Sequence, residues 1–336
     1  MRAADPKKVI TGLILACLVW SMIIPSNTAA ADAAGQEVMR LTVASGGKSL
    51  DVTGGSWYLL TGRTAKITVS GIPADQIKSV KYSSSKKKNA KISSKGKVTA
   101  KKKGNSVVTV KVTRTDGTIE SAKVTIRVIN SGFKKNKKYK GPGKFKSAVN
   151  KIRKKSDAQG RVIFYGSSSI RKWKTLAKDM SELEVLNHGF GGSTVNDCLY
   201  YADKLIIPYN PKAIVFYAGT NDIGFGYSAN KIYSRSVEFV KYIHNRLPDT
   251  RIYYVSQTKQ PKRAKVWKSM KKLNSKMAAY AAGDPLLTYI DTEPALNVPG
   301  RSKFFVKDGL HYTSEGYKVW TSVIQPVLYA DLVNTK

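Results

Sequence analysis

The chain has 336 residues, of which 42% are hydrophobic and 10% aromatic, so a wholly disordered protein is excluded and two domains of ordinary size are expected. Its 58 Lys and Arg against 22 Asp and Glu give a net charge of +36, which predicts a long-range attraction to polyanions that weakens with salt. Two Cys and three His exclude a disulfide framework and a multi-histidine metal centre, and no metal or cofactor is predicted.

The N-terminal segment has the pattern of an export signal. A basic stretch over 2–8 precedes an apolar run over 9–24, and small residues follow over 28–34. A basic region, an apolar region and an Ala-x-Ala cleavage site in this order are typical of a secretory signal peptide. The apolar run is short for a helix that crosses a bilayer. We therefore expect residues 1–31 to be a signal peptide or, alternatively, an uncleaved membrane anchor, and the protein to be secreted or associated with the cell surface.

Residues 38–130 carry short β-branched runs separated by Gly, Ser, Asn and Asp. Strict alternation over 107–112 and 124–128 predicts half-buried strands, and the sequence TDGT at 115–118 between them is typical of a hairpin turn. No helical period is evident. The segment is therefore expected to form an antiparallel all-β sandwich.

The same segment resembles the group-2 bacterial immunoglobulin-like domain. A run of Ser at 83–85, the sequence GKVTA at 96–100 and Gly104 fall where that family places them. The resemblance implies a module for surface display or adhesion, without catalytic residues. The lysine runs 86–88 and 101–103 are either a solvated face or a patch that binds an anionic cell-wall polymer. Nucleic acid is the weaker partner, because the chain has an export signal and lacks interleaved aromatic residues.

A basic segment separates this module from a region with a different pattern. Residues 131–145 are rich in Lys and Gly, as expected for a solvated linker. Over 146–336 apolar runs alternate with helical periods, which predicts a five-stranded parallel sheet in a three-layer, flavodoxin-like α/β domain. The predicted strands span 161–166, 183–187, 213–218, 251–255 and 287–291, and the predicted helices lie near 193–207, 228–247, 263–281 and 313–333.

Residues with catalytic potential follow four of the predicted strands. Three consecutive Ser at 167–169 follow the first strand, a Gly-rich turn over 189–192 the second, and the sequence GTND at 219–222 the third; Asp308 and His311 come after the fifth. The carboxyl ends of parallel strands share one rim, where ligands bind. A hydroxyl, an imidazole, a carboxylate and several N–H donors on one rim are the groups that acyl transfer needs.

This order and spacing resembles the SGNH (GDSL-type) esterase/lipase family over residues 146–333. The Gly-Asp-Ser block of the family stands here as GSS at 166–168, and its Gly-x-Asn-Asp and Asp-x-x-His blocks are intact. The resemblance implies an ester hydrolase that needs no cofactor. It also implies the roles of the site residues: Ser168 as nucleophile, His311 as general base, Asp308 as the residue that orients the imidazole, and Ser168, Gly192 and Asn221 as the oxyanion hole.

Two positions depart from the family pattern. Ser167 replaces the usual Asp before the nucleophile and Ser169 the usual Leu after it, so the choice of the middle serine rests on its alignment with Gly166. His188 is expected to be structural or, alternatively, to line the pocket. His244 is expected to take no part in the chemistry.

The predicted function is extracellular hydrolysis of carboxylic esters. The family acts on many esters, so the substrate class stays open among short acyl or acetyl esters borne by glycans, cell-wall polymers or lipids. Contact with a membrane is expected only through an uncleaved N-terminal segment. The alternative is a non-catalytic cell-surface binding protein that uses the basic immunoglobulin-like module.

Overall fold

The computed structural model describes residues 38–46, 48–130, 132, 139–155 and 158–334. The expected export signal at residues 1–31 lies outside these residues. Among the residues described, no helix is both long enough and apolar enough to cross a membrane.

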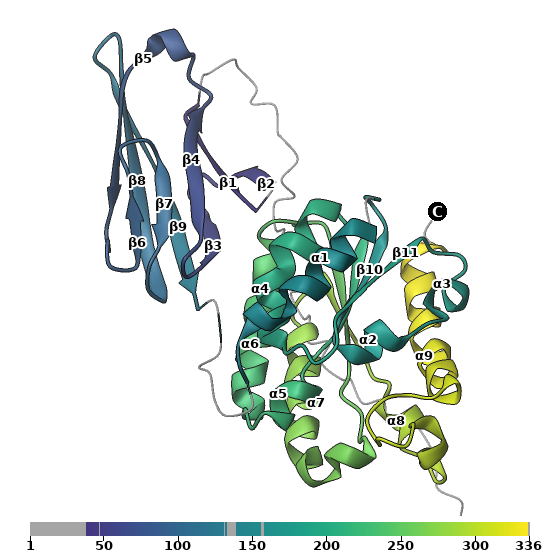
Figure 1. Ribbon diagram of the computed structural model, residues 1–336. Coiled ribbons are helices and arrows are strands. Elements are labelled where there is room, and N and C mark those ends of the chain that lie inside the picture. The colour runs from purple at the N-terminus through teal and green to yellow at the C-terminus, as the bar shows by residue number, and fades with distance from the viewer. Residues whose placement is uncertain (1–37, 47, 131, 133–138, 156–157, 335–336) are drawn as a thin grey trace, which may run out of the picture. The chain divides into compact units, whose positions relative to one another are not determined.

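The N-terminal region is a β-sandwich of two sheets (Figure 1). One sheet has the strand order β2-β1-β4-β7-β6 and the other β3-β9-β8-β5. Neighbouring strands run antiparallel except β3 and β9, which are parallel. The predicted antiparallel sandwich is therefore confirmed, with one parallel pair that an alternation pattern cannot reveal. The strands are β1 (Arg40–Ser45), β2 (Lys48–Asp51), β3 (Ser56–Leu60), β4 (Thr64–Ser70), β5 (Ile77–Ser84), β6 (Ala90–Ile92), β7 (Lys97–Ala100), β8 (Gly104–Arg114) and β9 (Ile119–Ile129).

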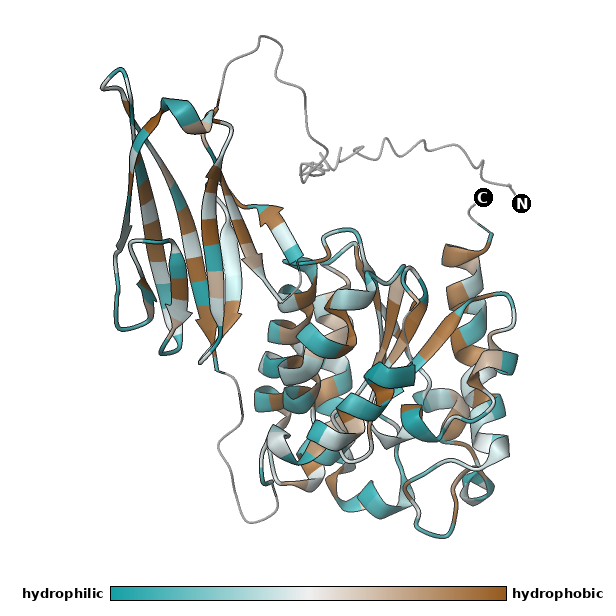
Figure 2. Ribbon diagram, turned by 45° about the horizontal axis from the view of Figure 1, so that its top comes forward, coloured by the Kyte–Doolittle hydropathy of each residue, from teal (hydrophilic) through white to brown (hydrophobic). Residues whose placement is uncertain are grey.

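The longest strands of the sandwich, β8 and β9, form a hairpin. Val108, Val110 and Val112 are fully buried, and polar side chains alternate with them, as the banding along the strands in Figure 2 shows. The chain turns at Gly117, where φ is +90°, and the N–H of Arg114 donates a 2.8 Å hydrogen bond to the Thr118 carbonyl. The predicted strand pattern and turn are confirmed.

The C-terminal region contains a parallel sheet with the order β11-β10-β12-β13-β14. Every residue of β10 and β12 is buried, because helices cover both faces of the sheet, and this is why these strands are continuous apolar runs. The predicted five-stranded parallel sheet is confirmed. Its strands are β10 (Val162–Gly166), β11 (Val185–Gly189), β12 (Ala213–Tyr217), β13 (Arg251–Val255) and β14 (Leu287–Ile290).

Alternate side chains of these strands enter two separate cores. Ile163 and Phe216 pack in the core formed with α1, α4, α6 and α7, whereas Phe164 and Tyr217 pack in the core formed with α2, α3, α8 and α9. Figure 1 shows the sheet between these two helical layers. The helices are α1 (Lys146–Lys155), α2 (Ser168–Lys172), α3 (Leu176–Asp179), α4 (Val195–Leu205), α5 (Thr220–Gly224), α6 (Ala229–His244), α7 (Trp267–Ala281), α8 (Glu293–Leu296) and α9 (Ser314–Leu332).

The part of the predicted linker that is described is not wholly solvated. Tyr139 is fully buried, and its hydroxyl donates a 2.8 Å hydrogen bond to Asp197 Oδ1. Phe145 is buried as well and packs edge-on against Phe190, with ring centroids 5.2 Å apart. The lysines between these aromatic residues suggested solvent, but burial of the rings dominates, since each ring removes a large apolar area from water.

Candidate active site

Ser168 lies at the carboxyl end of strand β10. The strand ends at Gly166 with φ +146°, where a Cβ atom would overlap the Tyr217 carbonyl oxygen, so only glycine fits. Ser167 and Ser169 are each 3% exposed, whereas Ser168, the first residue of α2, is partly exposed. Among the three consecutive serines, accessibility therefore favours the middle one as the reactive hydroxyl.

The fold brings the predicted acyl-transfer residues into one hydrogen-bonded chain. Ser168 Oγ lies 2.8 Å from His311 Nε2, although 143 positions separate the two residues. His311 Nδ1 lies 2.5 Å from Asp308 Oδ2. A carboxylate only accepts, so Nδ1 carries the proton it donates to Asp308, and Nε2 of the neutral imidazole is then free to accept from the serine hydroxyl.

The environment of Asp308 holds its carboxyl group in the charged form. Partial desolvation alone would raise its pKa, but hydrogen bonds from the backbone N–H and the imidazole of His311 and from the Leu310 N–H outweigh that effect. The pKa of Asp308 is therefore lowered well below its usual range. An ionised partner stabilises the imidazolium that forms when His311 accepts a proton.

Two polar side chains that the sequence analysis did not single out hold the Asp308–His311 loop and helix α2 in place. Gln260 Nε2 donates to the Leu310 carbonyl at 3.0 Å, inside the Asp308–His311 loop. The Tyr317 hydroxyl, on α9, donates to the Ser169 carbonyl at 2.7 Å. Gln260 follows the end of β13, as expected for a residue at the rim of a parallel sheet, but no feature of the sequence marks Tyr317.

The predicted oxyanion donors lie at the start of α2, on the loop after β11 and at the start of α5. In the described part of the chain, the N–H groups of Ser168 and Gly192 have no protein acceptor. Asn221 Nδ2 donates to the Ser193 carbonyl at 3.0 Å, and this uses one of its two amide hydrogens. Ser193 Oγ in turn donates to the Gly166 carbonyl at 3.1 Å, which ties the loop to the strand that carries Ser168.

Asp222, next to Asn221, is a buried acid whose hydrogen bond links helices α4 and α5. Both of its carboxyl oxygens lie 3.2 Å from the N–H of Val195, at the start of α4. Burial, and to a smaller extent the charge of Asp197, raises the pKa of Asp222 to about 8 in spite of that hydrogen bond. The side chain is therefore mostly protonated near neutral pH, and it links α4 and α5 without placing a full charge beside the site.

The remaining His and Cys residues that are described lie outside this chain of hydrogen bonds. His188 is fully buried, its Nδ1 lies 2.7 Å from the Leu205 carbonyl, and burial lowers its pKa. This matches the structural alternative for His188. His244 lies 3.7 Å from Asp284, and Cys198 is a buried free thiol. No group of three or more His, Cys, Asp and Glu side chains within the described residues could hold a metal ion.

Comparison with known proteins identifies both regions. Residues 157–319 match the model of the GDSL-like lipase/acylhydrolase family, and residues 48–126 match that of the bacterial Ig-like domain (group 2). The family match assigns the C-terminal region to the lipases and acylhydrolases as a class. The C-terminal domain belongs to the GDSL-like lipase/acylhydrolase family and follows a group-2 bacterial Ig-like domain, so both resemblances seen in the sequence are confirmed.

Several solved structures are similar to this chain over about half of its length. The chain is similar to a GDSL-like lipase from Bacteroides thetaiotaomicron VPI-5482 at 18% identity over 55% of this chain and 98% of that chain, with a TM-score of 0.48. It is similar to a protein from Bacteroides fragilis NCTC 9343 assigned as an acylhydrolase, at 20% identity over 59% and 99% of the two chains and a TM-score of 0.48. A lipase/acylhydrolase from Enterococcus faecalis matches at 18% identity over 51% and 96%, with a TM-score of 0.41. No curated protein matches the chain.

Proposed function

We propose that Ser168, His311 and Asp308 form a catalytic triad that hydrolyses carboxylic esters through an acyl-enzyme. The observation that supports this most directly is the unbroken chain of contacts, 2.8 Å from Ser168 Oγ to His311 Nε2 and 2.5 Å from His311 Nδ1 to Asp308 Oδ2. The 2.8 Å distance from Ser168 Oγ to His311 Nε2 lies in the range in which a base removes the proton of an attacking hydroxyl, and the contact with Asp308 orients that base.

In the first half of the reaction, Ser168 Oγ attacks the ester carbonyl while His311 Nε2 accepts its proton. The imidazolium formed then gives that proton to the departing alcohol, and the acyl group stays on Ser168. In the second half, His311 takes a proton from water, the resulting hydroxide attacks the acyl-serine, and the acid leaves. Asp308 stays ionised throughout and holds Nδ1–H in the required tautomer.

The negative charge that develops on the carbonyl oxygen is stabilised by three donors in this proposal. The N–H groups of Ser168 and Gly192 and the second amide hydrogen of Asn221 have no protein acceptor among the residues that are described. Each such donor contributes about 3–4 kcal/mol to the stabilisation of a transition state in comparable sites. The hydrogen bond from the Val195 N–H to Asp222 links α5, which carries Asn221, to the start of α4, three residues after Gly192.

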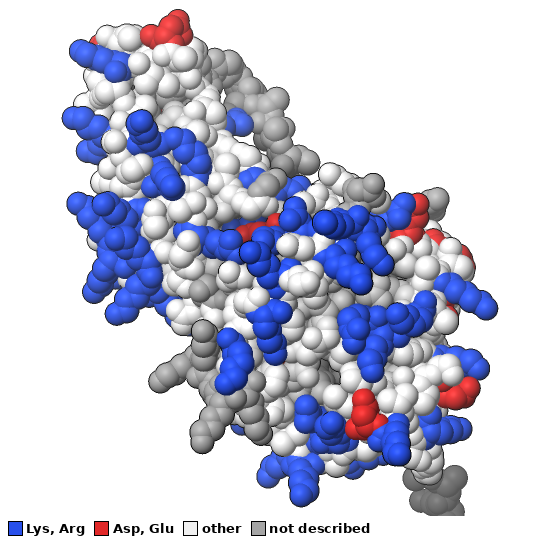
Figure 3. Space-filling model, viewed as in Figure 1, with Lys and Arg blue, Asp and Glu red and all other residues white. Residues whose placement is uncertain are grey.

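The proposed substrates are short acyl or acetyl esters outside the cell, borne by glycans, cell-wall polymers or lipids. The sequence of residues 1–31 supports export, and the Ig-like domain supports a place at the cell surface. An anionic cell-wall polymer is the proposed partner of the basic surface, on which Lys and Arg far outnumber Asp and Glu in Figure 3.

The test is the release of p-nitrophenol from acetyl, butyryl and octanoyl esters by the native chain and by Ser168→Ala. We expect the substitution to lower kcat/KM by a factor of about 10⁴ or more. Ser167→Ala is the matched control, because it removes a buried neighbouring hydroxyl and is expected to keep most of the activity.

Equal rates in the native protein and Ser168→Ala would contradict the assignment of the nucleophile. Absence of hydrolysis with every ester would contradict the catalytic proposal and favour a surface-binding protein. A decline in rate from acetyl to octanoyl would support the short-acyl assignment.

A further inference from the structure

A basic hollow lies within the α/β domain between α1, α2 and the end of β11. Its volume is about 530 Å³. Buried aromatic rings of Trp173 and Phe190 contribute to its lining, and the long side chains around it are cationic: Lys151, Lys155, Arg171 and Lys174. Neither the family match nor the proposed triad assigns a role to this hollow.

Among the residues that the structure describes, no acidic side chain neutralises the four cations of the hollow. No Asp or Glu is among the described residues that line it. Within the described ranges, none of the four has a carboxylate partner within 4.0 Å, and all four are exposed. Four like charges around one hollow repel one another, and a bound anion would relieve that repulsion.

Arg171 places this hollow beside the candidate active site. It follows Ser168 by three positions on α2, and side chains with that spacing on a helix are about 5–6 Å apart at Cβ. Its guanidinium lies against the oxyanion loop, since a Cβ atom added to Gly191 would be 2.9 Å from Arg171 Nε. Gly191 directly precedes Gly192. An anion bound at Arg171 would therefore lie close to an ester held at Ser168.

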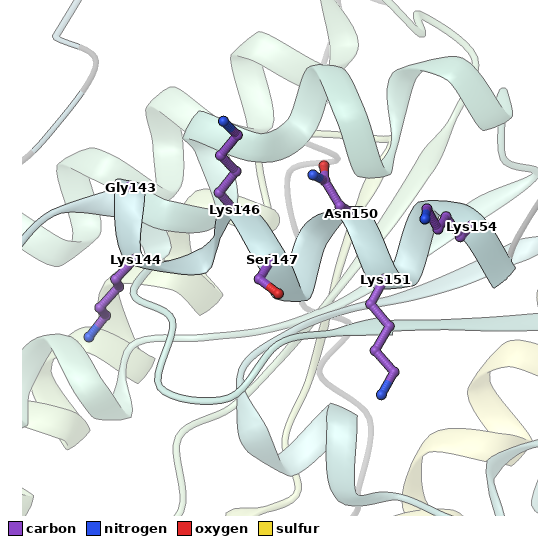
Figure 4. A pocket seen from close by; sticks show the side chains of 7 residues that line it. All are labelled: Gly143, Lys144, Lys146, Ser147, Asn150, Lys151 and Lys154. Carbon is purple, nitrogen blue, oxygen red and sulfur yellow. The ribbon is translucent and has the colours of Figure 1, made fainter.

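A second basic hollow continues along α1. Its volume is about 690 Å³, and Lys144, Lys146, Lys151 and Lys154 line it. Lys151 lines both hollows, so the two adjoin. Figure 4 shows the lysines spaced along α1, and Figure 3 shows positive side chains gathered over α1 and α2. Two adjoining cationic hollows suit a ligand with repeated anionic groups better than a single anion.

We propose that the two hollows form a binding track for the phosphate groups of a polyol-phosphate polymer, and that the ester cleaved at Ser168 is carried by that polymer. The proposal rests on the proposed ester hydrolysis and names its substrate class. Arg offers a planar fork of N–H donors and Lys a compact charge, and both bind phosphate oxygens. Water is consumed at the ester, the acid and the polymer hydroxyl are released, and the phosphodiesters stay intact.

The first test compares two small acetyl esters with the full chain, 1,2-diacetylglycerol 3-phosphate and its neutral counterpart triacetin. At low ionic strength, we expect kcat/KM for the phosphate ester to exceed that for triacetin by about tenfold or more, because a charge-assisted hydrogen bond contributes about that much. The triple variant Lys151→Gln, Arg171→Gln, Lys174→Gln is expected to lower this ratio about tenfold. The control is a second triple variant that removes three exposed charges of the Ig-like domain, Lys97→Gln, Lys111→Gln and Lys123→Gln. It should keep the ratio.

The outcomes separate this inference from the proposed function. Suppose that triacetin and p-nitrophenyl acetate are hydrolysed without a preference for the phosphate ester, or that the preference survives in the first triple variant. Either result would overturn the binding track and leave the esterase proposal standing. Absence of all hydrolysis would overturn both.

A second pair of substrates separates the polymer from a lipid source of phosphate. We expect faster acetate release from acetylated poly(glycerol phosphate) than from acetylated uncharged polyglycerol. The first triple variant should lose this preference. Faster acyl release from phosphatidylglycerol vesicles, with no preference for the charged polymer, would overturn the polymer assignment and name a lipid surface instead.

Discussion

The Ig-like sandwich and the α/β domain place polar side chains by different rules. In the sandwich, strands such as β8 have one buried and one solvated face, so polar residues such as Thr109 and Lys111 stand between buried valines. In the α/β domain, β10 and β12 are buried on both faces and carry no charged side chain, and the polar groups of the proposed site follow the strand ends. All five residues of the proposed triad and oxyanion hole lie beyond strand ends. In the sandwich, Lys and Arg therefore lie on solvated strand faces. In the α/β domain, part of the same excess lines the two hollows along α1 and α2.

The largest expected effect tests whether chemistry is confined to the α/β rim. His311→Ala removes the only base that contacts Ser168 Oγ among the residues described, so we expect kcat for p-nitrophenyl acetate to fall by about 10⁴. His244→Gln, which changes a histidine on α6 away from the rim, is the control and should retain the native rate. A comparable loss in both variants would show that the assay reports folding and not catalysis.

The next effect tests the amide donor on the same rim. Asn221→Ala is expected to lower kcat by about 10²–10³ with little change in KM, because the donor acts on charge that develops only in the transition state. The matched control is Asn230→Ala, an exposed amide on α6. An increase in KM with unchanged kcat would mean that Asn221 binds the ground state of the substrate.

Two glycine substitutions, one in each domain, extend the comparison to the free energy of unfolding. Gly166→Ala in the α/β domain would drive a Cβ into the Tyr217 carbonyl, so we expect it to lower the free energy of unfolding by about 3 kcal/mol or more. Gly117→Ala in the sandwich hairpin also has positive φ but meets no atom within 4 Å, so about 1 kcal/mol is expected. Urea unfolding with one transition per domain measures both. Equal losses would show that backbone strain alone, and not the close approach of two strands, makes glycine necessary at 166.

The last effect is a pH dependence of stability, and it concerns the buried acid beside Asn221. Folded Asp222 keeps its proton up to a pKa of about 8, whereas in the unfolded chain it loses that proton near pH 4. Between these values the folded state binds more protons, so Asp222 lowers the free energy of unfolding as pH rises, by at most about 1.4 kcal/mol per pH unit. Asp222→Asn should remove this slope in urea unfolding between pH 5 and 8. The exposed Asp249→Asn is the control, and parallel curves for native protein and Asp222→Asn would contradict the raised pKa.

The sequence was sufficient for much of the fold. Buried parallel strands are continuous apolar runs, and α4, α6, α7 and α9 are long enough to show a helical period, so these elements could be predicted. The helices α2, α3, α5 and α8 have only four or five residues, which is too few for a period to appear. Tyr139 could not be predicted as buried because its neighbours in sequence are lysines, and its partner Asp197 lies 58 positions away.

For the candidate site, the sequence by itself determined which residue types follow which strands. Parallel strands must bring those residues to one rim, and the resemblance to the SGNH family then implied the roles of Ser168, Asn221, Asp308 and His311 before any distance was known. Only the tertiary structure decided which serine is accessible, that His188 is buried away from the site, and that Gln260 and Tyr317 contact the Asp308–His311 loop and helix α2. Accessibility, burial and hydrogen-bond partners depend on segments that are far apart in the chain, so no local pattern encodes them. The basic track along α1 and α2 was likewise decided by the tertiary structure alone, because its lysines and Arg171 become neighbours only when the two helices pack beside β11.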